Sequence, residues 1–124
     1  MISGWGRHIV GNENSNPEVL LQATVDIVDP AICQDNPQIG SSWGPNQICT
    51  SDNSGDVNLS GACQGDSGGP LSVEVSEGVY EVWGATSYGV ATCDTTTGTS
   101  GVWAMAWGVK NWIDEVSGGE CPRN

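Results

Sequence analysis

The chain has 124 residues, and its 15 acidic side chains against 3 Lys and Arg give a net charge of −12. A chain of this length forms one domain or part of one, and its acidity excludes nucleic-acid binding through a basic face and attachment to a membrane by a polybasic surface. Its 18 glycines and 6 Trp, with no Phe, are typical of many short elements joined by turns, which favours an all-β fold.

The first half of the chain predicts short elements separated by polar loops. Residues 19–28 form the clearest strand, because Val25 and Ile27 alternate with polar neighbours. Asp29 followed by Pro30 predicts a helical turn, since Asp caps a helix and Pro fits its first position. The other expected elements here are the end of a strand at 1–6, loops at 7–18, 36–46 and 51–62, the helical turn at 30–35, and a short strand at 47–50.

The second half predicts a hairpin, a further strand and a terminal helix. Residues 70–75 and 79–88 alternate on either side of a turn, and Gly84 marks a kink or bulge in the second strand. A loop rich in Gly and Thr covers 89–101, and a last strand covers 102–106. The segment 107–116 predicts an amphipathic helix, with apolar residues at helical spacing. These residues are Val109, Trp112, Ile113 and Val116.

The chain contains five cysteines, which are Cys33, Cys49, Cys63, Cys93 and Cys121. None forms a CxxC pair, which disfavours a zinc site or a thioredoxin-like motif, and we expect neither a metal nor a cofactor. Wide spacing favours structural disulfides and an oxidising compartment, and the odd count leaves at least one cysteine unpaired within the chain. The first residues have no export signal, and no window approaches the ~18 apolar residues of a membrane span. An N-terminally incomplete chain of a secreted protein would reconcile these observations.

The most informative stretch covers residues 61–71 and places one serine, Ser67, among four glycines, beside Cys63 and Asp66. Glycines let the backbone turn sharply and bring its N–H groups close to a ligand, so this serine is a candidate nucleophile beside its own oxyanion site. The same G-x-S-x-G pattern marks the nucleophile elbow of α/β-hydrolases, which needs a helix directly after the serine. Pro70 and the alternating run behind it contradict that helix.

Two weaker signals favour plain structural interpretations. Residues 52–58 look like a calcium loop, but Val57 and Cys63 stand where an EF-hand has Gly and Glu, so a solvated loop is favoured. His8 is the only histidine and lies beside Arg7 in a polar loop, where an exposed histidine is favoured over a catalytic base.

The stretch from Ala62 to Leu71, with Cys63 four residues before Ser67, resembles the active-site serine motif of the chymotrypsin/trypsin-like serine proteases. Further matches follow the family's order along nearly the whole chain, at Ile2–Gly6, Ser87–Gly89, Gly101–Trp103 and Asn111–Ile113. The resemblance implies that residues 1–124 are the C-terminal half of such a protease domain. It would contain an antiparallel six-stranded Greek-key barrel over 1–106, the second of two barrels, and a C-terminal helix over 107–117.

The resemblance also implies roles for the residues around the serine. Ser67 would be the nucleophile, and the N–H groups of Gly65 and Ser67 would form the oxyanion hole. Asp66 would pair with the N-terminal ammonium that zymogen cleavage releases. The implied disulfides are Cys33–Cys49 and Cys63–Cys93.

Gly61 stands where the family has the floor of the primary specificity pocket, at which a trypsin-like enzyme carries Asp, and Gly89 and Gly101 match the pocket walls. An uncharged pocket implies a chymotrypsin-like or elastase-like preference for apolar side chains, although Asp94 could add charge nearby. The residues that the resemblance implies for substrate binding are Gly61, Ala62, Gln64, Ser87, Tyr88, Gly89 and Gly101.

The chain departs from the family pattern in several places. Nothing in it matches the first barrel, which carries the general-base His and its orienting Asp, so we expect negligible peptidase activity from these 124 residues alone. Val73 replaces a frequent cysteine, Trp103 a usual Tyr and Tyr88 a usual Trp, and Cys121 has no family partner.

The resemblance implies a secreted serine endopeptidase that acts on protein or peptide substrates, depends on an N-terminal barrel half missing from this chain, and can bind protein protease inhibitors. The alternative is a non-catalytic homologue that serves as a binding module. The intact motif around Ser67 favours the enzyme.

Overall fold

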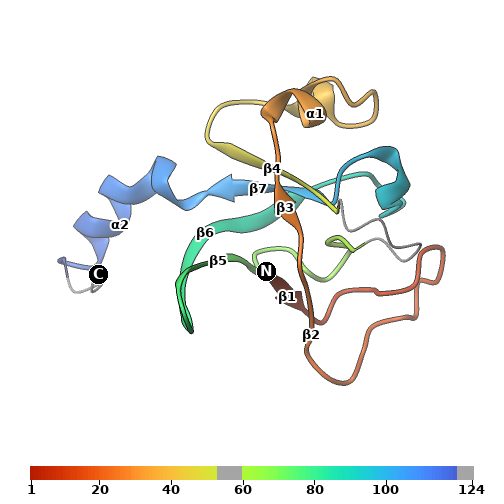
Figure 1. Ribbon diagram of the computed structural model, residues 1–124, viewed down its shortest axis with the longest axis horizontal. Helices are drawn as coiled ribbons and strands as arrows, with labels where there is room; N and C mark the ends of the chain where they lie inside the picture. Colours follow the sequence, from red (N-terminus) through yellow and green to blue (C-terminus); the bar gives the residue numbers. More distant parts are fainter. Residues whose placement is uncertain (53–59, 120–124) are drawn as a thin grey trace.

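The computed structural model describes residues 1–52 and 60–119, which form one curled antiparallel sheet with short helices at its margins (Figure 1). The strands are β1 (Ile2–Gly4), β2 (Leu21–Ala23), β3 (Asp26–Ile27), β4 (Gln47–Ser51), β5 (Pro70–Ser76), β6 (Val79–Tyr88) and β7 (Gly101–Met105). The helices are α1 (Pro30–Gln34) and α2 (Lys110–Val116), with 3₁₀ turns η1 (Gly40–Ser42), η2 (Thr95–Thr97) and η3 (Ala106–Val109). Cys121 and most of the stretch compared with a calcium loop lie outside the described residues.

The sheet closes on itself because its two edges belong to one stretch of chain. The strand order is β2-β1-β5-β6-β7-β4-β3, and every neighbouring pair is antiparallel. Only Thr24 and Val25 separate β2, at one edge, from β3, at the other. With β2 and β3 taken as one interrupted strand, the sheet is the six-stranded antiparallel barrel that the family resemblance implies.

The expectation of one continuous strand over 19–28 is wrong. The chain pairs with β1 through Ala23 and then with β4 from Asp26 onward, so the segment is two short strands. Val25 is buried whereas Ile27 is 46% exposed, so the two side chains do not share the buried face that their alternation predicts. A period-two pattern reports an extended backbone, and it carries no information about a change of pairing partner.

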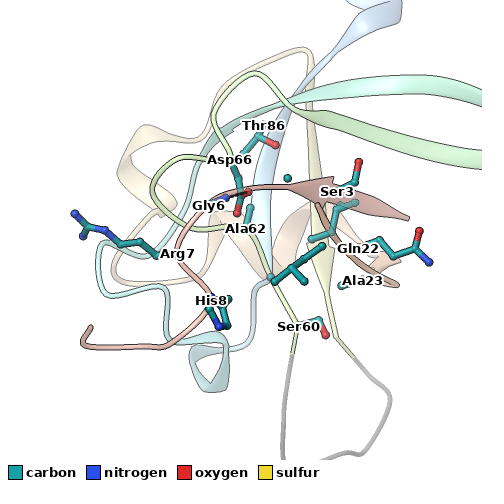
Figure 2. Close-up of a pocket in the computed structure, with 14 residues that line it drawn as sticks. Ser3, Gly6, Arg7, His8, Gln22, Ala23, Ser60, Ala62, Asp66 and Thr86 are labelled. Atoms are coloured by element: carbon teal, nitrogen blue, oxygen red, sulfur yellow. Dashed lines mark hydrogen bonds between the residues drawn. The ribbon is translucent and has the colours of Figure 1, made fainter. Parts of the chain in front are cut away.

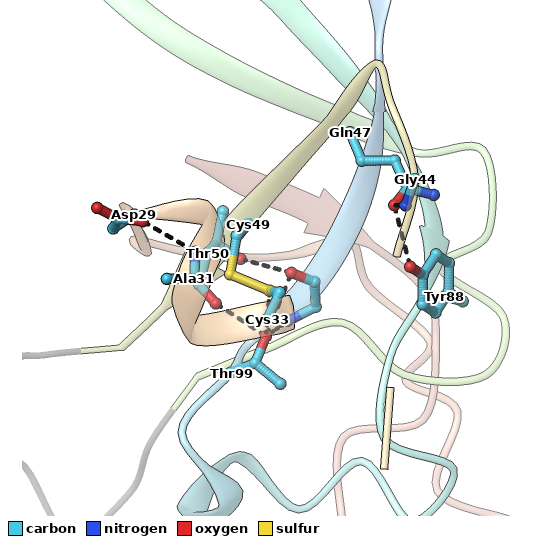
Figure 3. Close-up of a disulfide and its surroundings, with 10 residues drawn as sticks. Asp29, Ala31, Cys33, Gly44, Gln47, Cys49, Thr50, Tyr88 and Thr99 are labelled. Atoms are coloured by element: carbon cyan, nitrogen blue, oxygen red, sulfur yellow. Dashed lines mark hydrogen bonds between the residues drawn. A yellow bond between two sulfur atoms is a disulfide. The ribbon is translucent and has the colours of Figure 1, made fainter. Parts of the chain in front are cut away.

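Other local predictions are confirmed. The Asp29 carboxylate caps α1 by accepting a hydrogen bond from Ala31 N at 2.8 Å (Figure 3). β5 and β6 form the expected hairpin, whose turn contains Gly78 at a φ of +74°. The register between these strands shifts next to Gly84, where Trp83 is the extra residue of a bulge.

The C-terminal helix is shorter than the periodicity predicts. Residues 106–109 form a 3₁₀ turn, and α2 begins only at Lys110. Figure 1 shows α2 lying away from the body of the sheet. The apolar side chains that should anchor it are therefore exposed, with Val109 at 51%, Trp112 at 63% and Val116 at 64%. Within the described residues no helix combines the length and the apolarity needed to cross a membrane.

Two clusters of buried side chains fill the barrel and one of its margins. The first contains Ile2, Val25, Ile48, Leu71 and Trp103. The second surrounds a disulfide and contains Cys33, Ile39, Cys49, Val90 and Val102. The disulfide joins α1 to β4, with its two cysteines 0% and 1% exposed (Figure 3).

Replacing both Cys33 and Cys49 by alanine is expected to lower the free energy of unfolding by about 3 kcal/mol, the value that chain entropy gives for a loop of ~15 residues. The bond spans a sequence separation of 16 and closes such a loop. Urea denaturation followed by circular dichroism compares the variant with the oxidised parent. An unchanged midpoint and slope would show that the bond constrains the unfolded chain far less than the loop length implies.

Candidate active site

The loop over residues 63–69 presents Ser67 to solvent at the edge of the barrel. Gly65 and Gly68 have φ angles of +98° and +80°, in the left-handed region that glycine adopts without strain. Gly68 N donates to Thr86 O of β6 at 2.9 Å, which fastens the loop to the sheet. Ser67 is exposed on this loop, which the glycines allow to turn and the hydrogen bond to Thr86 attaches to the sheet.

Two backbone N–H groups of this loop have no acceptor among the described residues. Arg7 N donates to Gln64 O at 2.9 Å, which fixes the peptide plane between Gln64 and Gly65. The N–H groups of Gly65 and Ser67 themselves donate to no acceptor in the part of the chain that the structure describes. Unpaired donors beside a nucleophile are the arrangement that can stabilise a developing oxyanion.

No general base accompanies Ser67 within residues 1–52 and 60–119. The Ser67 hydroxyl forms no hydrogen bond to a described side chain. His8 is exposed, as the sequence predicts, and lines a cavity beside Asp66. The described residues therefore place an exposed serine hydroxyl in a loop with two unpaired backbone donors, and they hold no proton acceptor beside it of the kind that a nucleophilic serine needs.

Asp66 is held by the backbone on both sides of its carboxylate. Oδ1 accepts from Gly6 N at 2.8 Å and Oδ2 accepts from Cys63 N at 2.9 Å. A side chain at Gly4 or Gly6 would overlap this carboxylate, so both positions must be glycine for it to lie there. Gly4 and Gly6 thus form one unit with Asp66, although the sequence places Asp66 60 or more positions after them.

A cavity of about 280 Å³ lies against this carboxylate. Its lining includes Gly4, Gly6, His8, Gly61 and Asp66. Figure 2 shows the Arg7 side chain directed away from the Asp66 carboxylate. Among the described residues no basic group forms an ion pair with Asp66, so its negative charge faces the cavity with two backbone donors and no cation.

The structure brings four of the expected pocket residues together. Ala62 N donates to Ser100 O at 3.0 Å, which joins the segment containing Gly61 to the start of β7. Across from it, a Cβ at Gly89 would lie 3.5 Å from Gly101 Cα. Gly61, Ala62, Gly89 and Gly101 therefore meet where β6 ends and β7 begins.

The other three expected pocket residues surround this group. Gln64 Nε2 donates to Ala91 O at 2.9 Å, so its side chain links the serine loop to the loop after β6. Tyr88 OH donates to Gln47 Oε1 at 3.1 Å, which directs its ring towards β4 (Figure 3). Ser87 is exposed on β6.

The expected disulfide Cys63–Cys93 is present and ties the serine loop to the same loop after β6. Cys93 has a φ of +59°, which is uncommon for a residue other than glycine. Gln64 Oε1 lies 2.8 Å from one of the bonded sulfurs and 3.1 Å from the other. Because these sulfurs carry no hydrogen, the amide packs on the bond without donating or accepting there.

Asp94 directs its carboxylate to its own turn. The Thr96 hydroxyl and then the Thr96 backbone N–H donate to it, and these hydrogen bonds hold the pKa of Asp94 below its usual value. The two distances to Oδ1 are 2.6 Å from Oγ1 and 3.0 Å from N. The Asp94 carboxylate therefore accepts hydrogen bonds within its own turn, at the start of η2.

Sequence reasoning missed four residues that shape this site. Gly4 and Gly6 make room for Asp66. Two glycines so close together are the sequence signal that could have indicated the close approach of another segment. Arg7 contributes only its backbone N–H, which no side-chain pattern reveals. Thr95 packs against Gly61, and nothing in the Thr-rich loop distinguishes it from its neighbours.

Residues 1–113 match the family model for trypsin. The chain is 34% identical over 113 residues to transmembrane protease serine 9 of Rattus norvegicus, covering 91% of this chain and 10% of that protein. It is 30% identical over 118 residues to transmembrane protease serine 11C of Mus musculus, covering 95% of this chain and 26% of that protein. It is 33% identical over 115 residues to proproteinase E of Bos taurus, covering 93% of this chain and 43% of that protein. The chain thus spans less than half the length of each of these relatives.

Proposed function

This chain belongs to the trypsin family, and from that premise we propose that it carries the nucleophile and oxyanion hole of a serine endopeptidase. The observation that supports this most directly is an exposed Ser67 in a loop where two N–H groups, its own and that of Gly65, donate to no described residue. Because water can satisfy exposed donors, the two N–H groups are free to turn to a substrate oxygen when a substrate displaces that water.

In the proposed reaction Ser67 Oγ attacks the carbonyl carbon of the scissile peptide while a base takes its proton. The carbonyl oxygen becomes an oxyanion and accepts hydrogen bonds from Gly65 N and Ser67 N. The same base then protonates the leaving amine, and water hydrolyses the acyl-enzyme by the reverse sequence of proton transfers. In a serine protease, loss of one oxyanion donor lowers kcat by about 10²–10³-fold.

We place the base and its orienting carboxylate in an N-terminal barrel outside this chain. The surface of the described residues supports such a partner. A groove of about 1150 Å³ lies between the β5–β6 hairpin, the end of β7 and α2. Its lining includes Val82, Trp83 and Trp107, which are 61%, 42% and 72% exposed. Apolar surface of this extent is typical of an interface, and we propose that the first barrel covers it.

Asp66 and its cavity fit the proposed activation step. A carboxylate with backbone donors and no cationic partner can attract an ammonium, and the cavity of about 280 Å³ has room for the first residue of a newly cleaved chain end. Because Asp66 also holds Cys63 N, the ammonium would stabilise the loop that sets the Gly65 and Ser67 donors.

We propose secretion and a preference for apolar substrates as parts of the same function. The two disulfides favour an oxidising compartment, where protein protease inhibitors would be the expected regulators. Gly61 offers no charge to a basic substrate side chain, and the Asp94 carboxylate is engaged by Thr96. A chymotrypsin-like or elastase-like specificity follows.

The isolated 124 residues are expected to show no measurable peptide hydrolysis, because the described residues hold no base in contact with Ser67. The full-length protein is expected to react with a fluorophosphonate probe at Ser67, identified by mass spectrometry, and to lose both labelling and hydrolysis in Ser67→Ala. Hydrolysis by the isolated chain that disappears in Ser67→Ala would contradict the need for the N-terminal barrel.

One observation favours a second candidate, a non-catalytic homologue that binds partners: Ser67 has no base among the described residues. The fluorophosphonate probe distinguishes the endopeptidase from the binding module. A folded full-length protein that is unreactive towards the fluorophosphonate and hydrolyses no peptide would support the binding module.

A further inference from the structure

The free side of Gly61 is filled by a residue from another loop. A Cβ at Gly61 would lie 2.6 Å from Thr95 Cγ2 and 2.8 Å from Ser100 O. Contacts below 3 Å are too close for carbon against either atom, so no side chain fits at position 61 unless Thr95 and the backbone of Ser100 move. The methyl group of Thr95 occupies the space that a longer residue at 61 would use.

Thr95 is held in this position by the geometry of η2. The Asp94 carboxylate accepts from Thr96 N at 3.0 Å at the start of the turn. Gly98 N donates to Thr95 O at 3.1 Å at its end, where Gly98 has a φ of +101°. Both ends of this short turn are therefore fixed, and the Thr95 side chain is half-buried against Gly61.

Gly89 and Gly101 differ in the space beside them. A Cβ at Gly89 would lie 3.5 Å from Gly101 Cα, which is an ordinary contact distance. A Cβ at Gly101 would lie 2.9 Å from the fully buried ring of Trp103. Gly61 and Gly101 thus adjoin atoms that already fill the space beside them, whereas Gly89 has room for a Cβ.

We propose that Thr95 forms the floor of the primary specificity pocket through its methyl group and restricts the substrate residue before the cut to short side chains such as Ala and Val. This inference rests on the proposed endopeptidase function and narrows it. A pocket with this floor excludes Phe by depth and gives Arg no counter-charge, whereas a short aliphatic side chain reaches the methyl group without displacing it.

The test uses two variants of the full-length protein that differ in the Thr95 methyl group. Thr95→Ser removes the methyl group and keeps the hydroxyl. Thr95→Val keeps the methyl group and replaces the hydroxyl by a second methyl group. Initial rates on tetrapeptide substrates with Ala, Val, Leu, Phe or Arg before the cut give kcat/KM for each substrate. The control variant is Thr96→Ser, which loses a methyl group at an exposed neighbouring residue.

The parent is expected to cleave the Ala and Val substrates fastest. Thr95→Ser is expected to raise the Phe-to-Ala ratio of kcat/KM by about tenfold or more, the scale on which one methyl or methylene group acts in an apolar pocket. Thr95→Val and Thr96→Ser are expected to leave that ratio within about twofold. A parent that prefers Phe or Arg, or a ratio unmoved in Thr95→Ser, would overturn the role of Thr95 while leaving the endopeptidase intact. A parent that cleaves nothing and is not labelled at Ser67 would overturn both.

Discussion

Asp66→Asn in the full-length protein is expected to lower kcat/KM by about 10²–10³-fold, the range that corresponds to losing a few kcal/mol from a partly buried ionic contact. In the present structure the carboxylate accepts Gly6 N and Cys63 N through its two oxygens. An asparagine offers one oxygen and one amide nitrogen, so one backbone N–H would face another donor. The charge that we expect to attract the activated N-terminus would vanish at the same time.

Asp29→Asn is the matched control for this substitution. Asp29 also accepts a backbone hydrogen bond, from Ala31 N at 2.8 Å, but it caps α1 away from the Ser67 loop. Asparagine caps a helix about as well as aspartate, so kcat/KM should stay within about twofold. If Asp66→Asn also stays near the parent value, the carboxylate charge has no part in shaping the oxyanion hole, and the proposed activation step fails.

The features that could be predicted from the sequence are those encoded by neighbouring residues. Asp29 and Pro30 are adjacent, and the helical turn they predict is present with its cap. Ser76 to Gly78 encode the hairpin turn in the same local way. The disulfide partners, by contrast, came from a family resemblance, because five cysteines alone leave the pairing open.

The features that could not be predicted depend on tertiary partners. The 19–28 segment is extended throughout, yet it serves two edges of the sheet, and only the positions of β1 and β4 decide where it breaks. The apolar stripe of α2 predicted a packed helix, whereas the described residues leave it exposed. At the site, Thr95 meets Gly61 across 34 positions of sequence, which no local pattern encodes.

Trp103→Ala is expected to lower the free energy of unfolding by about 3–5 kcal/mol, the cost of emptying a large aromatic site in a core. The side chain is 0% exposed, and its cluster draws residues from four other parts of the chain: Ile2, Val25, Ile48 and Leu71. Urea denaturation followed by circular dichroism measures the loss. Trp5→Ala is the control, since Trp5 is 56% exposed and its removal should cost within about 1 kcal/mol.

Trp103→Phe separates packing from hydrogen bonding at the same position. The indole Nε1 of Trp103 is buried and has no acceptor in the part of the chain that the structure describes, and an unpaired buried donor costs about 1–3 kcal/mol. Phenylalanine removes that donor and keeps most of the ring, so it should cost less than half of what alanine costs. An equal cost for the two variants would mean that Nε1 does find an acceptor in solution.

Because the ring also lies under Gly101, Trp103→Ala should shift the Phe-to-Ala substrate ratio as well. A loss of stability with an unchanged ratio would assign the ring to the core and leave Thr95 as the residue that sets pocket depth.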